Sequence, residues 1–221
     1  MARIKNGILG GLSGKVGNVI GGHWNGIDYL RSVPTGVKQA NTILQQSQRM
    51  KFKTVIEFLR PQATLVRLGF KPSSEKSSAF NAAMSYNFHN ALTGDFESGF
   101  SIDYSKAALA KGNLPPIDGL VVESVESGKL NLTWSDNSQE AGAAEGDILY
   151  AGIYNSGKGA AVVRLNAAPR SAGSAVISLP KDYSGDVVHC YVGFFGVEAL
   201  SGVPSLKAIS TSVYAGPVTV M

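Results

Sequence analysis

The sequence predicts a basic α+β domain at residues 1–114, made of a β-hairpin and two amphipathic helices, followed by an all-β sandwich at residues 115–221. Three observations lead to this prediction. An Asn-Gly turn and two helical patterns lie in the first part, and short β runs recur along the second. The charge also changes sign: residues 1–114 carry 14 Lys and Arg against 6 Asp and Glu, and the remainder carries 6 against 10. Such a split indicates two domains with different neighbours.

The hairpin is expected at residues 15–31, with its turn at Asn25-Gly26. Asn-Gly adopts positive φ readily at both centres of a type I′ turn. A two-residue loop sets Trp24 opposite Ile27, and alternation along the strands then puts Trp24, Ile27 and Tyr29 on one face. Because this face is apolar, we expect another element to cover it.

Residues 1–14 form a glycine-rich arm that ends in Gly14-Lys15. A phosphate loop would need a glycine at position 9 and Ser or Thr after the lysine, where the chain has Leu9 and Val16. The arm is therefore interpreted as a flexible segment or an assembly contact.

The first helix is expected from Thr42, a suitable N-cap, to about Arg60. Pro61 either kinks this helix or begins a second one, and Gly69 is expected to end the helical segment. Four cations line up beside the apolar side of the helix: Arg49, Lys53, Arg60 and Arg67. Their stems can flank a buried face, or their charges can form a track for phosphates. We favour the first interpretation because no aromatic platform for base stacking lies among them.

A second helix is expected at residues 77–92, closed by Gly94, and a strand at residues 100–104. The apolar sides of both helices need a partner surface, and the hairpin face is the candidate. Pro115-Pro116 then interrupts regular structure where the charge balance changes sign, which places the domain boundary there.

From residue 117 onward, short β runs alternate with turn residues. Seven runs in about 105 residues is the count of an immunoglobulin-like sandwich. The runs are 120–125, 129–134, 147–154, 160–165, 175–179, 187–195 and 206–214.

Two resemblances follow from motifs. The segments Leu130-x-Leu132-x-Trp134, Leu179-Pro180, Tyr191-x-Gly193-x-Phe195 and Ser201-Gly202-x-Pro204 resemble a fibronectin type III module over residues 117–214. That resemblance implies a binding or spacer module and brings no catalytic residues.

The N-terminal motifs Trp24-x-Gly26-x-x-Tyr29-x-Arg31 and Gln45-x-x-x-Arg49-x-x-Phe52 are similar to an uncharacterised family of Bacteroidota proteins, a domain of unknown function. The segments Ser78-Ala-Phe-Asn81, Tyr86-Asn87 and Ile102-Asp-Tyr104 fit it as well, and the similarity extends over the full chain. It implies a bacterial or phage-encoded protein without a signal peptide and supplies no activity.

Few residues offer chemistry. His23 opposite Asp28 is an ordinary cross-strand pair, and His189 and Cys190 are expected on opposite faces of a strand, with Cys190 in the core. Asp136, Glu140, Glu145 and Asp147 are interpreted as a solvated acidic loop, since they lack the ligand spacing of a calcium loop. One cysteine excludes an internal disulfide, and no apolar run has the length of a membrane span.

These observations favour a non-enzymatic structural or adaptor protein of a larger assembly, best a phage virion or phage-tail-like particle. We expect protein subunits as partners, further copies of the chain included, and no cofactor, metal or small-molecule substrate. The location is the bacterial cytoplasm or a phage particle. The alternative is a nucleic-acid-binding protein that uses the basic half. The candidate interaction residues are Trp24, Tyr29, Arg31, Arg49, Lys53, Arg60 and Arg67.

Overall fold

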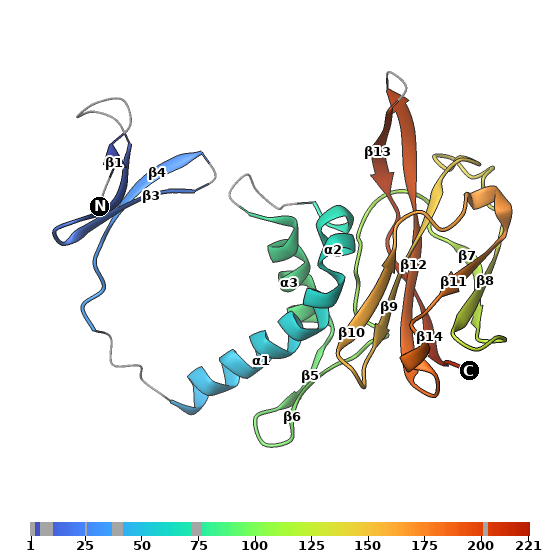
Figure 1. The fold of residues 1–221 in the computed structure, drawn as a ribbon, viewed down its shortest axis with the longest axis horizontal. Helices are drawn as coiled ribbons and strands as arrows, with labels where there is room; N and C mark the ends of the chain where they lie inside the picture. Colours follow the sequence, from blue (N-terminus) through green and yellow to red (C-terminus); the bar gives the residue numbers. More distant parts are fainter. Residues whose placement is uncertain (1–2, 5–10, 25, 37–41, 72–76, 201–202) are drawn as a thin grey trace. The chain divides into compact units, whose positions relative to one another are not determined.

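The computed structural model describes residues 3–4, 11–24, 26–36, 42–71, 77–200 and 203–221 (Figure 1). The chain divides into two compact units, Met1–Gln45 and Gln46–Met221, and each is described by itself. Helices and antiparallel sheets are both present, as the mixed fold class requires. The domain boundary expected after residue 114 lies within the second unit.

The first unit is an antiparallel sheet with the strand order β1-β2-β3-β4. In β3 and β4, Trp24 lies opposite Ile27 and Gly22 opposite Tyr29, which is the register expected for a two-residue connection. Gly26 has φ +82°, as the turn requires. Asn25, the linker at 37–41 and most of the glycine-rich arm lie outside the described residues. The strands are β1 Arg3–Ile4, β2 Leu12–Val16, β3 Val19–Trp24 and β4 Ile27–Ser32.

The helices follow the expected order, with a short 3-10 turn between the first two. They are α1 Ile43–Leu59, η1 Arg60–Gln62, α2 Ala63–Gly69 and α3 Ala79–Asn90. The backbone N–H of Gln45 donates to Thr42 Oγ1 at 3.4 Å, so Thr42 caps α1 as expected. Pro61 lies inside η1, where its missing N–H interrupts the α-helical bonding. Ser78 caps α3 by accepting from the N–H of Asn81.

Two glycines have roles other than those expected. Gly69 is the last residue of α2 and adopts no positive φ. A Cβ there would lie 2.5 Å from the carbonyl oxygen of Leu109, so Gly69 permits close packing and is not a left-handed stop. Gly94, with φ +92°, does not close α3. It lies in β5 Leu92–Asp95, which pairs with β6 Gly99–Ile102.

The remaining strands form two antiparallel sheets. One has the order β10-β9-β12-β13 with β14 also paired to β12, and the other has the order β11-β8-β7. The expected strand at 206–214 is wrong, because two strands share that region and pair with different parts of β12. The strands are β7 Asp118–Glu123, β8 Lys129–Ser135, β9 Ile148–Asn155, β10 Ala160–Arg164, β11 Ser174–Ser178, β12 Val187–Leu200, β13 Val203–Ile209 and β14 Val213–Thr219.

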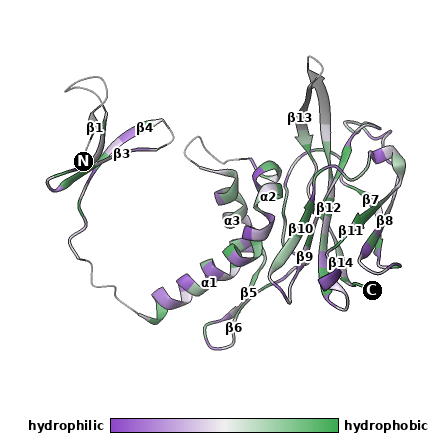
Figure 2. Cartoon of the chain, in the orientation of Figure 1, coloured by the Kyte–Doolittle hydropathy of each residue, from purple (hydrophilic) through white to green (hydrophobic). Residues whose placement is uncertain are grey.

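Both faces of the larger sheet are buried, so the second unit has three layers: helices, the five-stranded sheet and the three-stranded sheet (Figure 1). In β9, Leu149 and Ile153 point into the core between the sheets, whereas Tyr150 and Tyr154 point into the core beneath the helices. This alternation explains why the strand has almost no polar residues, a pattern typical of sheets covered on both faces (Figure 2).

Within the second unit, the helices pack on the five-stranded sheet, a partner that the sequence did not suggest. Val55, Phe58 and Leu59 of α1 share one core with the sheet tyrosines. The ring of Phe58 lies 5.2 Å from that of Tyr154 and 5.9 Å from that of Tyr191. Such aromatic contacts add to the stabilisation from burial alone.

A buried arginine forms hydrogen bonds to the loops at one end of the two sheets. Arg170 is fully buried, and its Nε donates to Asp147 Oδ2 at 3.0 Å. Its Nη1 donates to Asn137 Oδ1 and its Nη2 to the carbonyl of Pro115, while the guanidinium lies 4.0 Å from the ring centroid of Phe194. The interpretation of Asp147 as part of a solvated loop is therefore wrong, because Asp147 is the buried counterion of Arg170.

We predict that Gly152→Ala destabilises the second unit. A Cβ on this β9 residue would lie 2.7 Å from Leu109 Cδ1 and 3.0 Å from Leu65 Cδ2, so these two buried side chains would have to shift. Overpacking of this kind costs about 1–3 kcal/mol. Chemical denaturation measures the change, with Gly146→Ala as the control because a Cβ at Gly146 meets nothing within 4 Å. Equal stability of the two variants would contradict the packing described here.

Candidate interaction surfaces

An apolar groove lies between α1 and α3 and encloses about 450 Å³. Phe52 and Ile56 of α1 form one wall, and the rings of Phe52 and Phe88 lie 5.0 Å apart. Half of the surface of Phe52 remains exposed. The lining residues are Phe52, Ile56, Phe80, Asn81, Met84, Ser85, Phe88 and His89.

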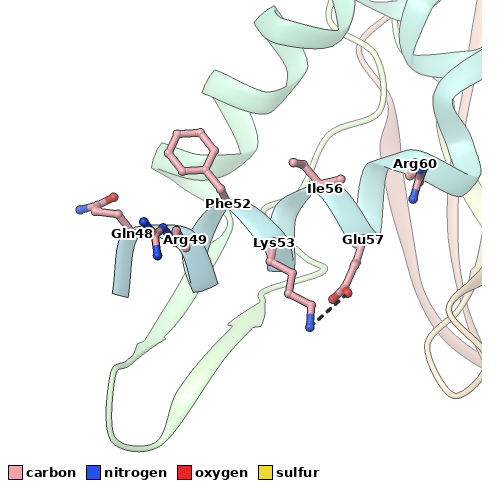
Figure 3. Close-up of a pocket in the computed structure, with 7 residues that line it drawn as sticks. All are labelled: Gln48, Arg49, Phe52, Lys53, Ile56, Glu57 and Arg60. Carbon is pink, nitrogen blue, oxygen red and sulfur yellow. Dashed lines mark ion pairs between the residues drawn. The ribbon is translucent and has the colours of Figure 1, made fainter. Parts of the chain in front are cut away.

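Cations border this groove on the outer side of α1. Figure 3 shows Phe52 directed to the side of α3, whereas Lys53 and Glu57 project from the opposite side of the helix. Lys53 Nζ lies 3.8 Å from Glu57 Oε1, and both side chains are exposed. Arg49 and Arg60 line a second hollow along α1, which shares Phe52 and Ile56 with the groove, and Arg67 is exposed on α2. All four predicted cations are thus at the surface beside apolar residues, which suits either interpretation of their role.

The N-terminal sheet carries the second candidate surface. Trp24, Tyr29 and Arg31 share one face, because each lies on β3 or β4 at positions of matching register. The structure therefore brings these three predicted residues together. Gly22 leaves room for the Tyr29 ring, since a Cβ on Gly22 would lie 2.8 Å from its Cζ atom.

This sheet exposes apolar side chains on both faces. Trp24 is 52% exposed and Leu30, on the opposite face, is 66% exposed. The sequence did not single out Leu30, because an apolar residue in a strand is expected to lie on a covered face. The exposed large apolar residues of the sheet are Val16, Val19, Trp24, Ile27, Tyr29 and Leu30.

The titratable residues lie as the sequence suggests. His23 Nδ1 and Asp28 Oδ1 are 2.7 Å apart across the strands, and both side chains are exposed. Cys190 points into the core between the sheets, where burial raises the pKa of its thiol to about 12. Among the described residues, no three His, Cys, Asp or Glu side chains are grouped so that they could hold a metal ion.

His189 lies on the helix side of β12. Its ring stacks on that of Tyr104 with centroids 3.7 Å apart, and its Nδ1 lies 2.9 Å from the hydroxyl of Tyr214. Burial lowers the pKa of His189 because the charged ring would lose its hydration.

A family model for a family of unknown function, DUF6266, matches residues 11–214. The chain belongs to this family. Membership in a family of unknown function is thereby confirmed, and the DUF6266 match includes both the N-terminal motifs and nearly all of the strands from β7 onward. A search of curated proteins finds no match. In the part of the chain that the structure describes, no helix is long and apolar enough to cross a membrane.

We predict that acid destabilises this DUF6266 protein through His189. The folded state keeps His189 neutral, whereas the unfolded chain binds a proton below about 6.5. The unfolded state then binds more protons, so the free energy of unfolding falls as the pH decreases from about 6.5 through the lowered pKa. His189→Phe keeps a ring against Tyr104 without a titrating group. Denaturation at several pH values should show a smaller acid loss in the variant, and equal losses would contradict the assignment.

The four cations provide a direct test of the nucleic-acid alternative. We predict that changing Arg49, Lys53, Arg60 and Arg67 to Gln leaves the weak affinity for duplex DNA and its salt dependence unchanged, because the stems flank an apolar surface. If the residues contacted phosphates, the slope of log affinity against log salt would fall by about 0.9 for each, or about 3.6 in total. A matched control changes the exposed cations Lys71, Lys129, Arg164 and Lys181 to Gln.

Proposed function

We propose that this DUF6266 protein is a non-enzymatic structural or adaptor subunit of a larger assembly and acts through protein–protein contacts. The observation that carries the proposal is the N-terminal sheet. It is a single layer that leaves Trp24, Ile27, Tyr29 and Leu30 exposed on its two faces. A sheet is stable when an apolar face is buried against another layer, so these residues suit contact with further subunits.

The second unit supports the same function. The groove between α1 and α3 offers a further apolar surface, bordered by Arg49 and Lys53. Strands β7, β8 and β11 form one sheet, and the facing sheet consists of β9, β10, β12, β13 and β14. This division supports an immunoglobulin-like or fibronectin type III-like module, which is a common scaffold for binding or spacing. We retain the division into residues 1–114 and 115–221 as a proposal, because these strands begin after that point.

A phage virion or phage-tail-like particle is the assembly we favour, encoded in a Bacteroidota bacterium or its phage. The protein then resides in the bacterial cytoplasm or in the particle. Support comes from the N-terminal motifs and from the combination of an apolar terminal sheet with a β-rich body. Nucleic-acid binding is the second candidate, motivated by the four exposed cations at Arg49, Lys53, Arg60 and Arg67.

Light scattering on the full-length chain tests the proposal. We expect a mass above the 23.2 kDa of one chain, with a concentration dependence typical of association. The double change Trp24→Ser and Tyr29→Ser removes exposed apolar surface and should shift the mass toward that of a single chain. Val176→Ser is the control, because Val176 is 63% exposed on β11 of the second unit. A single-chain mass at every concentration would overturn the proposal.

A further inference from the structure

The pairing of β4 with β3 determines which backbone N–H and C=O groups of β4 point to its outer edge. The N–H of Val33 donates to the carbonyl of Asn18 at 2.9 Å, so residue 33 bonds toward β3. Hydrogen-bonding direction alternates along an antiparallel strand, so Ile27, Tyr29 and Arg31 also bond toward β3. Asp28, Leu30 and Ser32 therefore direct their N–H and C=O groups away from β3. Within the first unit that side is the open edge, because β4 ends the strand order.

We propose that β4 of one copy pairs antiparallel with β4 of a second copy, about a twofold axis at Leu30. This inference rests on the proposed function and names the contact that joins two subunits. In an antiparallel pair of strands, two opposite residues either both hydrogen-bond to the partner strand or both do not. A residue of β4 that points outward therefore cannot lie opposite a neighbour that points toward β3. The twofold axis must then pass through a residue that lies opposite its own copy. Centring on Leu30 pairs Asp28 with Ser32 of the second copy, and uses every outward N–H and C=O of the three residues.

Side chains are complementary in this register. Residues directly opposite each other share a face, and the pairs are Ile27 with Val33, Asp28 with Ser32, Tyr29 with Arg31, and Leu30 with its own copy. These combine two apolar contacts, a carboxylate with a hydroxyl donor, and a guanidinium beside a phenol ring. No like charges face each other.

A register centred on Tyr29 is less favourable. It would set Asp28 opposite Leu30 and Ile27 opposite Arg31, so each charged group would face an apolar one. It would also leave the outward groups of Ser32 to pair with Gly26 at the turn.

The edge also lacks the bulges and prolines that prevent pairing. All six residues of β4 are exposed, and the strand pairs with β3 in one continuous register without a bulge. Proline enters only at Pro34, after the strand. By contrast, the edge strand β7 has an irregularity between Asp118 and Val121 and carries acidic side chains. Bulges protect edges from pairing, and the two charged residues of β4, Asp28 and Arg31, face a hydroxyl and a phenol in the proposed register. The strand β4 is therefore suited to accept another strand.

Leu30→Pro tests the pairing in the full chain. Proline is tolerated where a strand N–H faces the open edge, so β3 and β4 should stay paired. Two hydrogen bonds across the twofold axis are lost, which weakens the dimer by about thirtyfold at about 1 kcal/mol for each bond. Light scattering against concentration measures this loss. Unchanged association of Leu30→Pro would overturn β4 pairing while leaving the assembly proposal intact, whereas absence of association in the unaltered chain would overturn both.

Cross-linking tests the register without dependence on how the proline variant folds. Leu30→Cys places two thiols opposite each other across the axis and should form a covalent dimer under mild oxidation. The unaltered chain is the background, because its single thiol, Cys190, is buried. Leu44→Cys on α1, 79% exposed, is the control for random collision. Faster cross-linking of Tyr29→Cys than of Leu30→Cys, or no excess over Leu44→Cys, would overturn the Leu30-centred pairing.

Discussion

Close approach between the helical layer and strand β9 is the constraint on which the second unit depends. Gly152 has no side chain, so Leu65 and Leu109 reach the sheet surface there. Gly69 allows the segment at Leu109 to pass directly beneath α2. Because both glycines permit this close approach, the tyrosines of the sheet and the apolar side of α1 form one core. The helices and the sheets are therefore one compact unit, even though the charge pattern divides them.

Much of the local structure could be predicted from the sequence, because it depends on neighbouring residues. The pairing of Trp24 with Ile27, the Thr42 cap and the interruption at Pro61 each follow from local chemistry. The partner of the helices could not be predicted in the same way, since an apolar helix side fits any apolar face. One signal was available: Leu149–Tyr154 contains no charged residue, which indicates a strand buried on both faces.

The candidate surfaces were predictable to different extents. Trp24, Tyr29 and Arg31 share a face because strand alternation and register place them there. The groove was missed because Phe52 and Phe88 come from different helices and meet only in the tertiary structure. The role of Leu30 depends on strand order, which no local pattern determines. Residues whose role depends on distant neighbours are thus the ones that sequence reasoning omits.

The burial of Arg170 has a consequence for how far this fold tolerates variation in loop length. Its partner Pro115 precedes β7, whereas Asn137 and Asp147 lie at the two ends of the connection between β8 and β9, yet all three must be in position together. Removal of one partner from a buried ion pair leaves a charge without solvation, at a cost of about 3–5 kcal/mol. Insertions between Asn137 and Asp147 would therefore be poorly accepted, although the segment lies in a loop.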